Sequence, residues 1–181
     1  DVKSFHHLKI ELARERIETD TSIKVSNNIT RDNISQSLQN ILANKIAEIS
    51  ATINMIDTNT LDKIISAIQS AKRVQIIAVG NTIPVALDGA FKFNEIGIPT
   101  VAGSIWETQA SYSLNLTKKD VLIAISNSGE SSKIYTIVDL ANKRKVTTIG
   151  ITNNKNSAIG KIVKYHLQTA TREKLFLDEF Y

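Results

Sequence analysis

Serine residues cluster around one glycine directly after an apolar run of the chain. The apolar run covers residues 121–125, and residues 126–132 read Ser-Asn-Ser-Gly-Glu-Ser-Ser. A five-residue apolar run between polar residues is typical of a buried parallel strand. Apolar residues between Ile134 and Ala141 recur at helical spacing. The serine turn, which we define as residues 126–131, therefore lies between a predicted strand and the N-terminus of a predicted helix.

This position suits the binding of an anion. Free backbone N–H groups and the positive end of the helix dipole converge at a helix N-terminus. Gly129 allows the backbone to bend and to approach a ligand closely. No lysine or arginine lies within the turn, which therefore differs from a Walker loop with its Gly-Lys-Ser/Thr sequence. We predict a phosphate cradle of hydroxyl and amide groups, and a serine-capped loop without a ligand is the alternative. The predicted cradle consists of Ser126, Asn127, Ser128, Gly129 and Ser131.

Segments with strand and helix patterns alternate along most of the chain. Such alternation predicts an α/β fold, namely a doubly wound parallel sheet flanked by helices on both faces. The predicted strands cover residues 74–79, 100–102, 121–125, 146–151 and about 162–167. The predicted helices cover residues 84–96, about 106–114 and the stretch after the serine turn.

A second polar turn follows the first predicted strand. This glycine turn consists of Gly80, Asn81 and Thr82. In doubly wound sheets, ligands bind at the carboxyl ends of the strands, near the point where the strand order reverses. Both polar turns lie at such ends. We therefore predict that they form one pocket, in which the glycine turn is the wall that faces the serine turn.

The first third of the chain is organised differently. Apolar residues at helical spacing predict a long amphipathic helix over residues 34–56. This helix carries more isoleucine and leucine than its own sheet can cover, which predicts self-association. Residues 19–33 are rich in threonine, asparagine and serine and are typical of a linker. A short helix is predicted over residues 5–14, and the main domain is predicted to cover residues 34–181.

The composition excludes several classes of protein. With 181 residues, 42% hydrophobic and 22% charged, the chain is typical of a soluble globular protein with one well-packed domain and an appendage. No cysteine is present, which excludes disulfides and thiolate metal sites and is compatible with the reducing cytoplasm, where we expect the protein. No apolar stretch approaches the roughly 18 residues of a membrane span, so no membrane contact is expected. Histidine, aspartate and glutamate do not show metal-ligand spacing, so neither a metal nor a cofactor is expected.

The charge pattern does not predict a nucleic-acid surface. The net charge of +4 results from 22 basic and 18 acidic residues that are spread along the chain. The densest basic cluster, residues 143–145, closes the predicted helix after the serine turn. Positive charge stabilises the C-terminus of a helix, so we interpret this cluster as a helix end.

The two turns resemble those of the SIS (sugar isomerase) domain, in particular its version in RpiR-type bacterial transcription regulators. The family's phosphosugar signature, Ser-x-Ser-Gly-x-Ser/Thr, follows an apolar strand and is matched by Ser126, Ser128, Gly129 and Ser131. The family's first turn, Gly-x-Gly-x-Ser, is matched by Gly80 and Thr82, whereas Ala78 replaces the first glycine. The resemblance implies the flavodoxin-like sheet of SIS domains and the binding of a sugar phosphate.

The flanks of this region resemble the regulators. Residues 5–14 are similar to the end of the recognition helix in their helix-turn-helix domain. The resemblance implies that residues 1–18 are the tail of that domain, and that the chain stops before the helix that usually completes the fold. Where the regulators usually carry a His-x-Gln pair, this chain has Glu107 and Gln109, so the histidine is absent.

The resemblance implies a phosphosugar-sensing effector domain of a transcription regulator that controls sugar-metabolism genes. Its expected partners are a sugar phosphate, operator DNA bound through the missing N-terminal domain, and further copies of the chain in a homodimer or homotetramer. Glu107 and Gln109 are expected to complete the ligand site. A phosphosugar isomerase is the alternative, and such an enzyme needs a general base near the reacting carbons. For this alternative, Glu107 is the best candidate for the base. For the regulator, which is our main prediction, we expect no catalytic residue.

Overall fold

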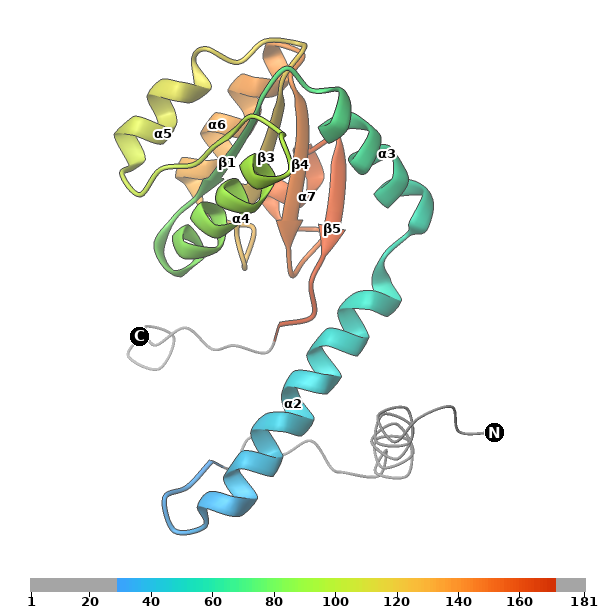
Figure 1. Cartoon of the computed structure of the whole chain (residues 1–181), viewed down its shortest axis with the longest axis vertical. Helices are drawn as coiled ribbons and strands as arrows, with labels where there is room; N and C mark the ends of the chain where they lie inside the picture. Colours follow the sequence, from blue (N-terminus) through green and yellow to red (C-terminus); the bar gives the residue numbers. More distant parts are fainter. Residues whose placement is uncertain (1–28, 172–181) are drawn as a thin grey trace. The chain divides into compact units, whose positions relative to one another are not determined.

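The computed structural model describes residues 29–171, drawn in colour in Figure 1. The chain divides into two compact units, one that ends at Ile49 and one that begins at Ser50. Most described residues of the first unit lie in helix α2 (Ile34–Met55), whose last turns belong to the second unit. The predicted helix over residues 34–56 is thus confirmed. The predicted helix over residues 5–14 and most of the predicted linker over residues 19–33 lie outside the described residues.

The second unit contains a five-stranded sheet with the strand order β2-β1-β3-β4-β5, and all its strand pairs are parallel. The chain passes from β1 outward to β2 and then returns to β3 on the other side of β1. The strand order therefore reverses between β1 and β3, as in flavodoxin-like sheets. The predicted doubly wound architecture is confirmed. The strands are β1 (Val74–Ala78), β2 (Thr100–Val101), β3 (Val121–Ile125), β4 (Thr147–Thr152) and β5 (Tyr165–Gln168).

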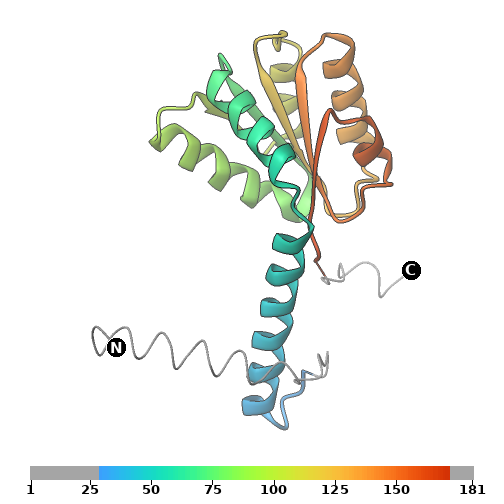
Figure 2. The same ribbon diagram turned by 90° about the vertical axis from the view of Figure 1, so that its right-hand side faces the viewer.

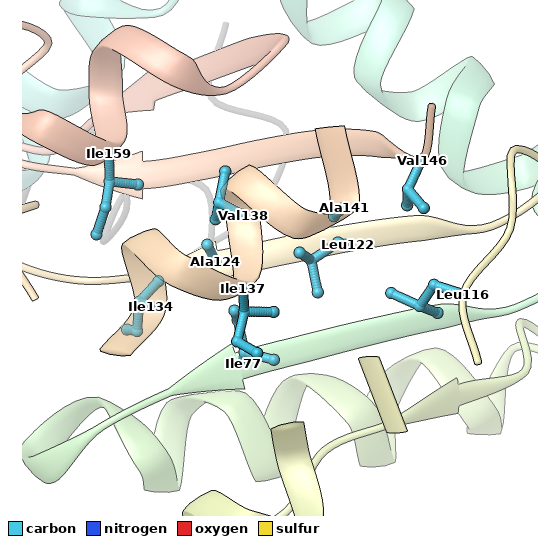
Figure 3. Close-up of a cluster of buried hydrophobic side chains, with 10 residues drawn as sticks. All are labelled: Ile77, Leu116, Leu122, Ala124, Ile134, Ile137, Val138, Ala141, Val146 and Ile159. Atoms are coloured by element: carbon cyan, nitrogen blue, oxygen red, sulfur yellow. The ribbon is translucent and has the colours of Figure 1, made fainter. Parts of the chain in front are cut away.

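Helices cover both faces of the sheet (Figure 2). One cluster of buried apolar side chains joins the sheet to α3 and α4, and a second cluster joins it to α5, α6 and α7. Figure 3 shows the second cluster, in which α6 packs on Leu122 and Ala124 of β3. Val121 and Ile123 belong to the other cluster, because successive side chains of a strand point to opposite faces. The helices are α3 (Thr58–Ser70), α4 (Ile83–Glu95), α5 (Trp106–Ser113), α6 (Ser132–Lys143) and α7 (Ala158–Ile162).

The end of the sheet differs from the prediction. A strand was expected near residues 162–167, whereas the chain forms α7 (Ala158–Ile162) first and β5 starts only at Tyr165. Ser157 caps α7, because its side-chain oxygen accepts a hydrogen bond from the backbone N–H of Gly160. A helix of five residues is too short to show a helical period in the sequence.

The basic cluster over residues 143–145 is a helix end, as predicted. Helix α6 ends at Lys143, and Lys145 has the positive φ angle of 61° that reverses the chain direction after a helix. None of the helices within residues 29–171 combines the length and the apolar character needed to cross a lipid bilayer.

Candidate functional site

The structure brings the glycine turn and the serine turn side by side. Strands β1 and β3 are hydrogen-bonded neighbours, with Ala78 opposite Ile125 at their carboxyl ends. The hydroxyl of Thr82 donates to the backbone oxygen of Val79 at 2.9 Å and also lies 3.3 Å from the backbone oxygen of Ile125. Helices α4 and α6, which follow the two turns, cover opposite faces of the sheet. The two turns therefore lie at the point of reversal, where doubly wound sheets bind their ligands.

The serine turn leaves the start of α6 open to a ligand. Ser131 is the N-cap residue of α6, and its side chain forms no capping hydrogen bond. The capping bond expected from Ser131 in the alternative of a serine-capped loop is therefore not formed. The first backbone N–H groups of a helix have no partner within the helix. Together with the helix dipole, these groups favour an anion at the start of α6.

The other two serines of the turn differ in exposure. Ser126 is buried, and its hydroxyl oxygen accepts a hydrogen bond from the backbone N–H of Gly129 at 3.2 Å. Ser128 is exposed, and its oxygen accepts from the backbone N–H of Glu130 at 3.3 Å. Both hydroxyl protons are still available to donate, because in each of these bonds the serine oxygen is the acceptor. Ser126 thus holds the shape of the turn, while Ser128 and Ser131 can present donors to a ligand.

Backbone hydrogen bonds from the segment after β4, which includes the start of α7, hold the serine turn. The backbone N–H of Ile159 donates to the oxygen of Gly129 at 3.0 Å, and that of Asn153 donates to the oxygen of Asn127 at 2.8 Å. Gly129 is buried with a φ angle of 73°, a conformation that favours glycine. A side chain at this position would meet Ser157, since a Cβ atom would lie 2.1 Å from its Oγ. Gly129 is therefore required both by its backbone angle and by the close approach of Ser157.

Thr152 at the end of β4 and His166 in β5 contact each other within the sheet. The Oγ1 atom of Thr152 is 2.9 Å from Nε2 of His166. Burial lowers the pKa of His166, and the positive charge of Lys155 acts in the same direction. The imidazole is consequently neutral at neutral pH and fit for a hydrogen bond with a hydroxyl group.

The glycine turn is exposed and ready to contact a ligand. Residues 80–82 form one turn of 3-10 helix, and Gly80 has a φ angle of 59°. Gly80 and Asn81 are exposed, whereas Thr82 is half-buried through its contacts with the strand ends. A Cβ atom added to Gly80 would meet no atom within 4 Å. Gly80 is thus required by its backbone angle and leaves open space for a ligand.

The side chain of Gln109, which was expected to complete the ligand site, is engaged within the fold. It is 1% exposed, and its carboxamide both accepts from the N–H of Ala78 at 2.9 Å and donates to the oxygen of Ala78 at 3.0 Å. Strand β2 ends at Val101, which pairs with Gln75, so no strand reaches Ala78 on this side. The carboxamide of Gln109 makes the two hydrogen bonds that a backbone peptide group would make if β2 extended as far as Ala78. These hydrogen bonds position the end of β1 and do not support a direct contact of Gln109 with a ligand. Glu107, by contrast, is exposed in the first turn of α5.

Replacing Gln109 by methionine should therefore weaken the domain. Methionine has a similar volume but leaves the N–H and the oxygen of Ala78 without a partner, which should lower the free energy of unfolding by about 1–3 kcal/mol. Urea unfolding followed by circular dichroism measures this change. The same substitution at the exposed Gln69 of α3 is the control and should have little effect. Equal stability of the two variants would contradict the assigned role of Gln109.

A cation–π pair at this edge of the sheet was not predicted from the sequence. The ammonium group of Lys133, the second residue of α6, lies 5.7 Å from the ring centre of Trp106 at the start of α5. Trp106 packs against the same core cluster as Val79, the residue that directly precedes the glycine turn. The pair brings a positive charge to the N-terminus of α6 although the serine turn itself contains none. Its only sequence signal was the position of Lys133 two residues after Ser131.

The structure also contains an apolar cavity of about 290 Å³ that is distinct from this site. Its lining residues include Val74 and Gln75 at the start of β1, and Tyr112 near the end of α5. It is therefore at the opposite end of β1 from the glycine turn. The chemistry described above belongs to the open edge formed by the two turns and not to this cavity.

Comparison with known proteins connects these turns to a family. The profile of the SIS domain matches residues 67–181. A relative from Clostridium perfringens, named as an uncharacterized HTH-type transcriptional regulator, is 27% identical over 173 residues, which are 95% of this chain and 62% of the relative. The chain thus spans about three fifths of the length of the curated relatives that it matches first.

Solved structures share the fold. The NanR protein of Vibrio vulnificus, complexed with ManNAc-6P, has a TM-score of 0.71 and 22% identity over 78% of this chain and 54% of its own. The sugar isomerase domain of an RpiR transcription factor from Sphaerobacter thermophilus has a TM-score of 0.72 and 23% identity over 76% of this chain and 78% of its own. Phosphoheptose isomerase GmhA from Neisseria gonorrhoeae has a TM-score of 0.67 and 16% identity over 78% and 89%. The fold is therefore shared by regulators and enzymes.

Proposed function

Because the chain belongs to the SIS domain family, we propose that it is the sugar-phosphate-sensing part of a cytoplasmic RpiR-type transcription regulator. In this proposal residues 34–181 are the sensing domain, residues 19–33 a linker and residues 1–18 the tail of a helix-turn-helix domain. Relatives named as HTH-type transcriptional regulators match nearly the whole chain, which supports this assignment. A sugar phosphate would change the affinity of the complete protein for its operator DNA, since a ligand that prefers one conformation shifts the equilibrium toward it.

One observation carries the proposal. The uncapped N-terminus of α6 lies beside the exposed glycine turn at the point where the strand order reverses. A phosphate group offers the oxygen acceptors that the free N–H groups of α6 and the hydroxyls of Ser128 and Ser131 require. Lys133 adds a positive charge at the same helix end. We expect the glycine turn and Glu107 to contact the sugar.

Titration calorimetry with a panel of sugar phosphates tests the proposed ligand. We expect at least one member to bind, and the free sugar without its phosphate to bind far more weakly. Operator binding by the complete protein, measured with and without that sugar phosphate, tests the regulatory role. The present chain alone should not bind DNA specifically, because its charge is scattered and only slightly basic.

A phosphosugar isomerase is the second candidate, since phosphoheptose isomerase GmhA shares the fold. This reaction needs a general base within reach of the reacting carbons. Glu130 is bound at the start of α7, because its carboxylate accepts from the N–H of Ala158 at 3.2 Å. Glu107 is thus the carboxylate to test. We expect no turnover of the sugar-phosphate panel, and turnover at ordinary enzymatic rates would favour the isomerase and assign the base to Glu107.

We further propose that the chain forms a homodimer or homotetramer through α2 and the sensing domain. Large apolar side chains are exposed along α2 and also on α4, where Phe91 is 63% exposed. Exposed apolar residues in such number are typical of a surface that another chain covers. Those on α2 are Ile34, Leu38, Ile41, Leu42, Ile46, Ile49, Ile53 and Met55.

Leu42→Glu should weaken this self-association, because it places a charge within the apolar stripe of α2. Light scattering at micromolar concentration should show an oligomer for the natural chain and a smaller species for the variant. Gln39→Glu adds the same charge at an exposed polar position of α2 and is the matched control. A natural chain that is monomeric under these conditions would exclude the proposed assembly.

A further inference from the structure

The three residues after β5 touch both the serine turn and the last part of α2. We call residues 169–171 the strap. The hydroxyl of Thr171 donates to Oδ1 of Asn127 in the serine turn at 2.6 Å. The backbone N–H of Ala170 donates to Oγ1 of Thr52 in α2 at 3.0 Å. The backbone N–H of Thr169 donates to the oxygen of Thr152, which continues the pairing of β5 with β4. The strap is thus anchored in the sheet and connected to two further elements.

Asn127 is the point at which a ligand can act on the strap. Its backbone oxygen is held by Asn153, and its side-chain oxygen accepts from Thr171. Its side-chain NH₂ group makes no hydrogen bond to another residue of the described range 29–171, so it can donate to a phosphate oxygen. A ligand bound there would fix the carboxamide of Asn127. It would also strengthen the bond from Thr171, because hydrogen bonds in a chain polarise one another.

The contact between Thr171 and Asn127 can open and close. Thr171 is exposed, so water competes for its hydroxyl group. A hydrogen bond in such a position contributes little by itself and opens readily, so a ligand can shift its equilibrium. The other end of the strap contacts Thr52 within the continuous helix from Ile34 to Met55.

We propose that the strap couples occupancy of the serine turn to α2, with Asn127 and Thr171 as positioning residues. Ligand binding closes the bond between Thr171 and Asn127, orders the strap and thereby stabilises the bond between Ala170 and Thr52. Within the sensing domain, helix α2 connects the part that carries the sheet to the N-terminal part of the chain, so the signal reaches the end at which a DNA-binding domain would lie. This inference depends on the proposed function, because it requires a phosphate-bearing ligand at the serine turn.

Hydrogen exchange tests the coupling on the isotope-labelled chain, with inorganic phosphate as the probe. In the natural chain, saturating phosphate should slow exchange of the Ala170 amide and of the last amides of α2 by about twofold to tenfold, the shift that one hydrogen bond can bring. Thr171→Val keeps the side-chain shape but removes the hydroxyl. It should abolish this phosphate-dependent slowing and lower phosphate affinity by no more than about the same twofold to tenfold factor, because the coupling between two equilibria is reciprocal.

Thr169→Val is the matched control, since it makes the same chemical change two residues earlier and keeps the backbone N–H that bonds to Thr152. It should retain the response of the natural chain. Thr52→Val removes the acceptor at the other end and should accelerate exchange of the Ala170 amide with and without phosphate. If Thr171→Val binds phosphate and its exchange response is as large as that of the natural chain, the strap proposal is wrong, whereas the proposed function is unaffected. Failure of the natural chain to bind phosphate or any sugar phosphate would refute the proposed function, and the strap proposal with it.

Discussion

Gly129→Ala is expected to lower the free energy of unfolding by about 2–5 kcal/mol, the sum of backbone strain and steric overlap. The φ angle of 73° at Gly129 is unfavourable for any residue with a Cβ atom. That Cβ atom would also lie 2.1 Å from Oγ and 2.5 Å from Cβ of Ser157. Rotation of the Ser157 side chain cannot relieve the second contact. Urea unfolding measures the loss of stability, and calorimetry should show that sugar-phosphate binding is lost as well.

Gly80→Ala separates strain from overlap. Gly80 also has a positive φ angle, but a Cβ atom there would meet no atom within 4 Å. This variant should therefore lose only the strain contribution, about 1–2 kcal/mol. Ser157→Gly in the Gly129→Ala background removes the overlapping atoms and should recover part of the stability, although it also removes the cap of α7. Equal losses for Gly129→Ala and Gly80→Ala would show that Ser157 does not pack against the serine turn.

The double substitution of Ser128 and Ser131 by alanine is expected to reduce sugar-phosphate affinity by at least about a hundredfold. Each serine should contribute one hydrogen bond to a charged phosphate, worth about 1.5–3 kcal/mol. The fold should be retained, because Ser128 is exposed and the side chain of Ser131 does not cap α6. Calorimetry with the best ligand of the panel measures the loss, and circular dichroism checks the fold.

Ser132→Ala is the control for this experiment. Ser132 is the neighbouring exposed serine and lies outside the predicted cradle. It should bind the ligand as the natural chain does. An unchanged affinity in the double variant would remove Ser128 and Ser131 from the site, and the open N–H groups of α6 would then be the remaining candidates for phosphate binding.

The sequence by itself predicted the elements that depend on local patterns. Apolar runs and helical spacing were sufficient for β1, β3 and β4 and for the helices α2, α4, α5 and α6, because each pattern is local in the sequence. Both polar turns were recognised for the same reason, since serine, threonine and glycine stand next to each other in the sequence. The short helix α7 was missed, and β5 was placed too early, because neither segment is long enough to show a period.

Only the tertiary structure decided how these elements serve a site. Three contacts near the site join residues that are 27 to 31 positions apart in the sequence. They are the contacts of Gln109 with Ala78, of Ser157 with Gly129 and of Lys133 with Trp106. The strap is an extreme case, since Ala170 and Thr52 are 118 positions apart. Such pairs leave no local pattern, because their proximity results from the order of the strands and from the faces on which the helices pack. The sequence therefore predicted which residues could bind a phosphate, and the sheet topology determined which of them are free to do so.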